Sequence, residues 1–312
     1  MVSSDAPIIY HPFFQPGIPL LGVAGVLFVF PSATFLFFLK KHTHAKEKLM
    51  KSDFDLIVHK FDKPIKIYPI ADVHYGAINH QKEAWYNFCK KIEAEEDSYL
   101  ILDGDLINNN TRSSVGSPFD DFVRPREQKI AMVEFLEPLK DKILCLTSGN
   151  HEQRSLKDVD DDPTYDIACK LDIEDIYRQN AVFMKVGIGE KDKGHGRVGA
   201  KQVYIFSITH GSGGGGIYTG ATVNRNERWG NIIDADCIVV GHTHKGSVTR
   251  PSKVVVDPFN NRVFVRDYLV ISCVAWQDYG EYALKKMLLP TKTADPQILL
   301  LHEDKHKITV TW

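Results

Sequence analysis

The sequence predicts an α/β protein, and three observations support this fold class. Between residues 54 and 147, segments typical of strands alternate with segments typical of helices, which is the pattern of βαβ units and a parallel sheet. A polar cluster follows each of these strands, at the edge where α/β proteins place their functional residues. The rest of the chain contains mostly strand-like segments and glycine-rich turns. The 312 residues are enough for a sizeable core.

The first half of the globular region supplies the alternating elements. Short apolar runs predict strands at residues 56–58, 65–70, 99–102 and 143–147. Apolar residues at the i, i+3, i+4, i+7 spacing predict a helix over 80–96, with a buried face made of Trp85, Phe88, Cys89 and Ile92. A second helix is expected over 127–140, bent near Pro138, with a core face of Ile130, Val133 and Leu136.

The second half contains mostly strands. After one helix near 164–171, strands are expected at 181–186, 203–209, 236–240, 298–301 and 308–310. A glycine- and charge-rich turn is expected around 187–199. Two further runs, 247–256 and 262–273, are typical of a hairpin around Pro258-Phe259-Asn260-Asn261.

The first 51 residues differ from the rest and are interpreted as an N-terminal extension, followed by one globular domain over 52–312. Residues 18–39 are uncharged and mostly apolar for 22 residues and end at Lys40-Lys41, which suits a membrane-spanning helix of about 20 residues with a cytoplasmic basic flank. A hydrophobic hairpin packed on the body, or an extension outside the working protein, are the alternatives. A cleaved signal peptide is disfavoured because no lysine or arginine precedes the apolar run.

Charge and cysteine content narrow the class of protein. Five lysines and two acidic residues lie in residues 1–51, which leaves 33 basic and 38 acidic residues after them, a net charge of −5. No global positive field therefore indicates nucleic-acid binding, although a local basic groove stays open. The five cysteines are scattered without a CxxC pair. We therefore expect a reducing compartment, the cytoplasm, with tethering to the inner face of the membrane if residues 18–39 span it. The sequence indicates no oligomeric state.

Residues of the types that ligate metals follow five of the expected strands. In chain order they are Asp72-x-His74, Gly104-Asp105, Gly149-Asn150-His151-Glu152, His210-Gly211 and Gly241-His242-x-His244. Each motif alone arises easily by chance, but five in succession do not. Nitrogen and oxygen donors without a thiolate suit Mn²⁺, Fe, Zn²⁺ or Ni²⁺ better than a structural zinc site. Seven ligands are too many for one tetrahedral ion and suit two ions that share one bridging ligand.

This ordered set of motifs resembles the signature of the calcineurin-like metallophosphoesterases. All five blocks, D-x-H, G-D, G-N-H-[DE], H and G-H-x-H, are present in family order across residues 72–244. The spacing looks most like that of stand-alone phage- or prophage-type members. The resemblance implies a four-layer α/β/β/α sandwich of the metallophosphoesterase type. It also implies hydrolysis of a phosphate-ester substrate by a hydroxide that bridges two metal ions.

Carried over position by position, the resemblance implies two sets of ligands around one bridge. The first metal would be held by Asp72, His74 and His244. The second would be held by Asn150, His210 and His242. Asp105 would bridge the two ions. Asp105 and His151 would be the two catalytic residues. His151 would face the phosphoryl group and protonate the leaving oxygen or stabilise charge on it. The implied cofactors are two divalent ions, Mn²⁺ first, with Fe, Zn²⁺ or Ni²⁺ as alternatives. Gly149 is expected to permit a sharp turn, and Glu152 to support the ligands.

The block after Asp105 departs from the pattern of the family's protein Ser/Thr phosphatases. Those enzymes supply an aspartate and a phosphate-gripping arginine, where this chain has Asn108 and Asn109. A phosphodiesterase or nuclease-like activity is therefore favoured over a protein phosphatase. A small-molecule phosphomonoesterase and a non-catalytic metal-binding scaffold are the alternatives. Asn109, Arg112 and Arg154 are candidate substrate contacts, although either arginine equally fits a surface ion pair. Because Asn108 replaces the carboxylate that orients the catalytic histidine, the sequence leaves the orientation of His151 open.

Overall fold

The structure is a computed structural model that describes residues 52–112, 114, 119, 121–192, 194, 198–213 and 218–312. The N-terminal extension and its apolar segment 18–39 lie outside the described residues, so the anchor and the domain boundary stay predictions. Among the residues that are described, no helix has both the length and the apolar character needed to cross a bilayer.

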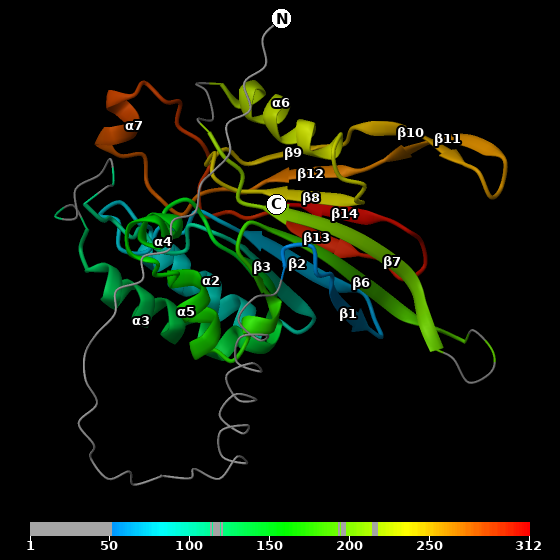
Figure 1. Cartoon of the computed structure of the whole chain (residues 1–312), viewed down its shortest axis with the longest axis horizontal. Helices are drawn as coiled ribbons and strands as arrows, with labels where there is room; N and C mark the ends of the chain where they lie inside the picture. Colours follow the sequence, from blue (N-terminus) through cyan, green and yellow to red (C-terminus); the bar gives the residue numbers. More distant parts are fainter. Residues whose placement is uncertain are drawn as a thin grey trace, which may run out of the picture. The chain divides into compact units, whose positions relative to one another are not determined.

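Two six-stranded sheets form the centre of the molecule (Figure 1). The first sheet has the order β14-β13-β2-β3-β4-β5. Its strands are β2 (Ile65–Ile70), β3 (Ser98–Asp103), β4 (Ile143–Thr147), β5 (Tyr177–Arg178), β13 (Ile298–Leu301) and β14 (Ile308–Thr311). The second sheet has the order β1-β6-β7-β8-β12-β9. Its strands are β1 (Ile57–Phe61), β6 (Ala181–Asp192), β7 (Val198–Thr209), β8 (Cys237–Val240), β9 (Ser247–Thr249) and β12 (Leu269–Ser272).

Parallel pairing places several strand ends at the same edge. Strands β2, β3, β4 and β5 pair in parallel in sequence order, as the βαβ pattern predicts. In the second sheet, β7, β8 and β12 also pair in parallel. The carboxyl ends of each parallel set therefore share one edge of a sheet.

Six α-helices lie among the residues that the structure describes. They are α2 (Lys82–Ala94), α3 (Pro125–Leu136), α4 (Glu152–Val159), α5 (Pro163–Lys170), α6 (Thr219–Gly230) and α7 (Glu281–Lys285), with 3-10 turns η2 (Glu137–Lys142) and η3 (Glu174–Ile176). Helix α2 buries the four residues predicted for its core face. The helix expected over 127–140 is shorter than predicted, because α3 ends at Leu136 and the chain continues through Pro138 as the 3-10 turn η2; α3 buries Gln128, Met132 and Leu136. Ile130 is 46% exposed, so its assignment to the core was wrong.

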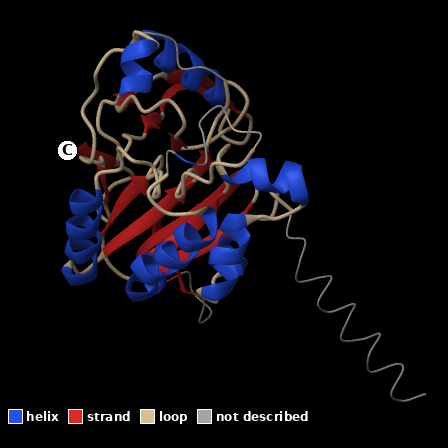
Figure 2. Cartoon of the chain, turned by 90° about the vertical axis from the view of Figure 1, so that its left-hand side faces the viewer, coloured by secondary structure: helices blue, strands red, loops and turns tan. Residues whose placement is uncertain are grey.

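Three apolar clusters separate four layers and confirm the α/β/β/α sandwich. The largest lies between the two sheets and joins residues such as Ile67 and Ile101 of the first to Met184 and Phe206 of the second. A second cluster joins the other face of the first sheet to α2, α3 and α5. A third includes Ile238 of β8 and Trp229 of α6. Figure 2 shows helices on both outer sides of the strands, with the loops at one edge facing the viewer.

One predicted turn and the length of one predicted hairpin differ from the structure. The expected turn over 187–199 is largely strand, because β6 and β7 continue their antiparallel pairing as far as Asp192 and Val198. Gly187 lies in this ladder, and a Cβ on it would come within 2.9 Å of the Ala200 side chain, so the glycine permits a close cross-strand approach. The predicted hairpin around 258–261 is present as β10 (Ser252–Asp257) and β11 (Arg262–Asp267). Its expected outer parts instead form β9 and β12 of the second sheet.

Candidate active site

The predicted ligand motifs lie in five loops that follow strands of both sheets. Asp72 and His74 follow β2, Asp105 follows β3, and Asn150 follows β4 in the first sheet. The second sheet contributes His210 after β7 and the turn 241–244 after β8. Backbone hydrogen bonds join neighbouring loops, such as the His74 amide to the Asp105 carbonyl at 2.9 Å.

Five of the predicted ligands have backbone conformations that residues other than glycine rarely adopt. Their φ angles are positive, at 55° for Asp72, 49° for His74, 50° for Asp105, 68° for His242 and 55° for His244. Such conformations cost on the order of 1–3 kcal/mol each and are typical of functional sites, where the surrounding structure fixes them. The fold therefore holds these side chains at a cost in stability.

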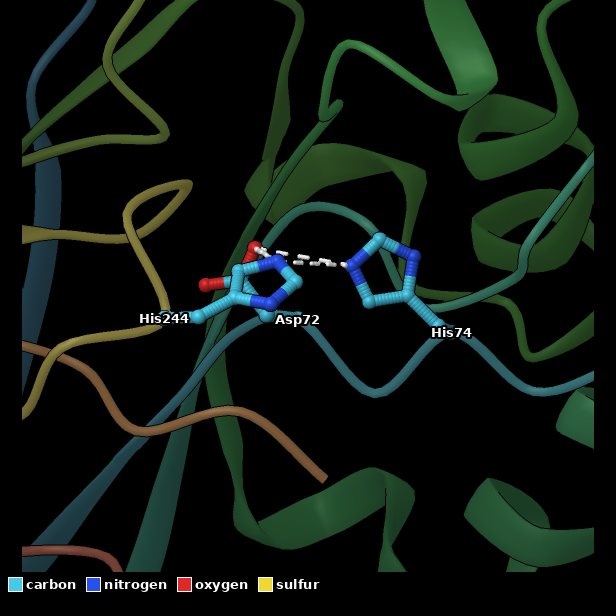
Figure 3. A group of neighbouring side chains, drawn as sticks. All are labelled: Asp72, His74 and His244. Atoms are coloured by element: carbon cyan, nitrogen blue, oxygen red, sulfur yellow. Dashed lines mark hydrogen bonds and ion pairs between the residues drawn. The ribbon is translucent and has the colours of Figure 1, made fainter. Parts of the chain in front are cut away.

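Asp72, His74 and His244 form one compact group (Figure 3). The two Nε2 atoms of His74 and His244 lie 3.1 Å apart. The Nε2 atom of His244 is 3.3 Å from Asp72 Oδ1. One ligand atom from each of the three residues lies within 4.8 Å of the others, as ligands of a single ion would.

Asp105, His210 and His242 form a second group of the same kind. The Nε2 atom of His210 lies 3.1 Å from Asp105 Oδ2. Asn150 joins this group, because its Oδ1 is 2.6 Å from Nδ1 of His242. Asp105 also connects the two groups, since its Oδ2 is 3.7 Å from His74 Nε2. The seven predicted ligands thus converge from five loops.

Backbone carbonyls orient two of the histidines in this second group. Nδ1 of His210 is 2.6 Å from the Asp103 carbonyl, which leaves Nε2 facing Asp105. Nε2 of His242 is 2.9 Å from the Gly213 carbonyl, which leaves Nδ1 facing Asn150. A histidine that ligates a metal usually donates its other ring N–H to such an acceptor.

The charges of the site fit bound cations. The Asp72 and Asp105 carboxylates are buried, and among the described residues only histidines lie within ion-pair distance of them. Nε2 of His210 is buried without a hydrogen-bond partner. Burial by itself would lower the pKa of His210, but Asp105 and Asp72 raise it well above its usual range. Buried carboxylates that need positive charge, opposite inward-facing imidazole nitrogens, suit two divalent ions.

His151 is oriented by backbone groups. Its amide donates to Asp105 Oδ1 at 2.8 Å, and its Nδ1 is 2.7 Å from the Asn108 carbonyl. The Asn108 carbonyl therefore takes the place of the carboxylate that the sequence lacks. Burial lowers the pKa of His151 to about 3. Because Nδ1 faces this carbonyl, Nε2 is the ring nitrogen left to accept a proton from a substrate or to return it, and it lies 3.9 Å from Asp105 Oδ2.

Glu152 and Gly149 hold the loops after β3 and β4 together. The buried Glu152 carboxylate accepts hydrogen bonds from the amides of Asp105, Ile107 and Gly149, each at 3.0 Å. A Cβ on Gly149 would lie 2.1 Å from Asp105 Oδ1. The sequence predicted that Gly149 permits a sharp turn, but its φ angle is not positive, so its backbone conformation does not require glycine. Its lack of a side chain lets Asp105 approach.

A polar network around Asp121 was not predicted from the sequence. Asp121 Oδ1 accepts hydrogen bonds from the side-chain Nδ2 atoms of Asn108 and Asn110, at 2.6 and 2.8 Å. Its Oδ2 accepts one from the side-chain Nε2 of Gln128 at 2.8 Å. Gln128 Oε1 in turn accepts from the Asn109 backbone amide at 2.9 Å. The network fixes the backbone of residues 108–110, which includes the carbonyl that orients His151. Nothing in its residue types distinguishes it from an ordinary polar loop.

The three predicted substrate contacts lie in different environments. The Asn109 side chain is buried and donates to the His151 carbonyl at 2.8 Å and to Ser155 at 2.9 Å. Arg154 is half-buried in α4, and its Nη1 donates to Asn110 Oδ1 at 3.2 Å and Ser114 Oγ at 3.3 Å. Arg112 is exposed. All three stay predictions as substrate contacts. Asn109 belongs to the network around Asp121, and Arg154 is joined to it through Asn110.

The chain belongs to the calcineurin-like phosphoesterase family, whose model matches residues 65–246. This membership confirms the resemblance inferred from the five motifs. No curated protein matches the chain significantly.

Several solved structures are similar to the chain at low identity. A predicted phosphoesterase from Streptococcus pneumoniae TIGR4 is 11% identical, with 79% of this chain and 93% of that chain covered and a TM-score of 0.30. A metallophosphoesterase from Sphaerobacter thermophilus is 15% identical, with 79% and 87% covered and a TM-score of 0.35. Vps29 from Entamoeba histolytica, complexed with zinc, is 10% identical, with 79% and 97% covered and a TM-score of 0.29.

Proposed function

We propose that the protein hydrolyses phosphate esters with two divalent metal ions. Asp72, His74 and His244 would hold one ion, Asn150, His210 and His242 the other, and Asp105 both. The observation that carries the proposal is the convergence of two ligand groups that Asp105 connects, in a member of this family. Two such metal ions, when bound, activate water at neutral pH and neutralise charge on a phosphoryl group.

The protein's own residues would position the substrate and manage protons. Nε2 of His151 is the atom placed to exchange a proton with the ester, because Nδ1 is held by the Asn108 carbonyl. Arg154, three residues further along α4, would add positive charge on the same side of the helix. Mn²⁺ is the proposed metal because the carboxylate and amide oxygens suit it, and Fe, Zn²⁺ or Ni²⁺, which the four imidazoles suit, are the alternatives.

For the substrate, we favour a phosphodiester over a phosphoprotein. The side chain of Asn108 is bonded to Asp121, and that of Asn109 is buried against α4. Neither therefore supplies the carboxylate or the phosphate-binding guanidinium of the protein phosphatases. A diester carries one negative charge less than a monoester and requires less positive charge in the site. Small-molecule phosphomonoesters are the second candidate, since Arg154 fits a dianionic phosphate.

A substrate panel tests this proposal. Aryl phosphomonoesters and phosphodiesters, nucleotides, and single- and double-stranded DNA would be incubated with the full chain and added Mn²⁺. We expect the aryl diester to have the highest kcat/KM. A higher value for the monoester would reverse the assignment of the substrate. If metal binds and no ester is hydrolysed, the protein is a metal-binding scaffold instead.

Replacement of the bridging residue tests the metal centre. Asp105→Asn should abolish diester hydrolysis and lower the metal content measured by mass spectrometry. Asp304→Asn is the matched control, because the Asp304 side chain is 73% exposed in a loop between β13 and β14. It should leave both quantities unchanged. Hydrolysis that survives in Asp105→Asn would show that the mechanism does not require two bridged ions.

A further inference from the structure

Helix α6 packs on the second sheet, close to the end of β7, which the proposed ligand His210 follows (Figure 1). Trp229, in the last turn of the helix, packs against Ile238 of β8 and donates from Nε1 to Ser207 Oγ of β7 at 3.0 Å. Arg225 lies one turn earlier, and residues at i and i+4 share a face of a helix. The helix therefore directs Arg225 toward the loop that follows β7.

The guanidinium of Arg225 is bonded to the turn 211–213. Its Nη1 donates to the Gly213 carbonyl at 2.6 Å and to the Ser212 carbonyl at 3.2 Å. The guanidinium also lies over Gly213, because a Cβ built there would lie 3.6, 3.7 and 3.8 Å from three of its atoms. Gly211 and Gly213 have φ angles of 83° and 76°, which favour glycine. No backbone-to-backbone hydrogen bond between described residues involves this turn, so side chains hold it.

The Gly213 carbonyl is also the acceptor that orients His242. Nε2 of His242 lies 2.9 Å from this oxygen, which cannot donate, so Nε2 carries the proton and Nδ1 keeps its lone pair. The His242 amide is fixed separately, because it donates to Asp72 Oδ2 at 2.9 Å. The ring can still rotate about its terminal torsion, which has broad minima. The position of one carbonyl oxygen therefore decides whether Nδ1 faces the other ligands of the second ion.

We propose that Arg225 is a positioning residue of the second metal site and acts on His242 through the Gly213 carbonyl. One carbonyl oxygen accepts from both Nη1 of Arg225 and Nε2 of His242, so the guanidinium determines where the histidine finds its acceptor. A guanidinium suits this role because it is planar, holds its donors in a fixed geometry and stays protonated. The inference rests on the proposed two-ion site, but not on which ester that site hydrolyses.

A titration of the full chain with Mn²⁺ alone tests this inference. Electron paramagnetic resonance of the free ion gives the dissociation constants of both bound ions in each variant. His242→Ala identifies the second ion, since it removes one of that ion's ligands. We expect Arg225→Ala to raise the dissociation constant of that same ion about tenfold, the lower end of the loss that follows removal of a group supporting a ligand. The constant of the other ion should stay unchanged.

Two further variants separate positioning from folding. Arg228→Ala is the matched control, because Arg228 is exposed in the same helix, three residues further on, and it should leave both constants unchanged. Arg225→Lys keeps a charged donor on a long side chain and should recover part of the lost affinity. Equal weakening of both ions in Arg225→Ala, without recovery in Arg225→Lys, would mean a general loss of structure and would contradict the proposal.

Turnover of an aryl phosphodiester provides a second readout. Arg225→Ala should need more Mn²⁺ for half-maximal turnover, whereas its KM for the ester at saturating Mn²⁺ should equal that of the wild type. A raised KM with unchanged metal affinity would overturn the proposal, because the guanidinium would then bind the substrate itself. A wild type that binds two ions and hydrolyses no ester would refute the proposed function, while the metal titration would still decide the role of Arg225.

Discussion

At the scale of single residues, replacement of His151 tests the proposed catalytic role separately from metal binding. Its Nε2 is the proton-exchanging atom in the proposed reaction, whereas the two ligand groups are complete without it. His151→Ala should therefore lower kcat by about 10²- to 10⁴-fold, the usual contribution of a general acid or base. Its metal content, measured by mass spectrometry, should equal that of the wild type.

The opposite result for His151 is also informative. His151, His74 and Asp105 have ligand atoms within 4.8 Å of one another, so the geometry also permits His151 to act as a ligand. Loss of both metals in His151→Ala would show that it does. His151→Gln provides the comparison, because a glutamine can keep a hydrogen bond to the Asn108 carbonyl while it cannot deliver an imidazole proton.

Gly149 makes a second prediction at this scale. A Cβ at this position would overlap Asp105 Oδ1 and the Asp105 amide, at 2.1 and 2.2 Å, so one of the two loops must move. Gly149→Ala should lower the free energy of unfolding by about 1–3 kcal/mol, as measured by urea titration. In contrast, Gly220→Ala in α6 has no atom within 4 Å of the new Cβ and should raise stability by about 0.5–1 kcal/mol. Equal effects would show that the clash at Gly149 is relieved without cost.

The candidate ligands could be proposed from the sequence, and the groups that orient them could not. Asp72, His74, Asp105 and the later motifs are recognisable because carboxylates and imidazoles follow successive strands. The acceptor for His151 is instead the main-chain carbonyl of Asn108, which every residue type possesses. The sequence has Asn108 where a carboxylate was expected, and it therefore left His151 without an orienting group. In the structure, the backbone carbonyl of Asn108 is that group.

At the scale of elements, the N-terminus of α4 connects two strand ends through Glu152. Its carboxylate accepts three amide hydrogens, whereas a glutamine amide would place N–H donors against N–H donors. Glu152→Gln should therefore cost about 1–3 kcal/mol of unfolding free energy. Glu127→Gln, exposed in the first turn of α3, is the control and should cost about 0.3–1 kcal/mol at most. A Glu152→Gln variant as stable as this control would contradict the connecting role.

Elements were predicted well where burial leaves an apolar pattern. The strand over 65–70 and the buried face of α2 agree with the structure for that reason. Helices α4 and α6 were not predicted, because α4 buries Glu152 and Ser155 and α6 buries Thr222, Asn226 and Gly230. Polar and small residues at a spacing of three or four do not raise the apolar periodicity from which a helix is recognised.

At the scale of the whole molecule, the stability at mildly acidic pH depends on buried histidines such as His80. This residue lies in the chain between the loop that contains Asp72 and His74 and helix α2. It forms an isolated antiparallel β-bridge with Gln277, in the segment after β12. It is 6% exposed, and its Nδ1 is 2.8 Å from the Val73 carbonyl. Burial lowers the pKa of His80 to about 4, although this hydrogen bond opposes the shift.

A lowered pKa determines the sign of the pH dependence. Between about pH 6.5 and pH 4, the unfolded chain binds a proton at His80 that the folded chain does not, so folding loses stability as the pH falls. From pH 7 to pH 5, His80 should cost about 2 kcal/mol, since each proton contributes about 1.36 kcal/mol per pH unit. Urea titrations of the wild type and His80→Gln at both pH values, with a chelator present to remove pH-dependent metal binding, measure this contribution. The wild type should lose about 2 kcal/mol more than the variant, and equal losses in the two proteins would mean that His80 is protonated alike in the folded and unfolded chains.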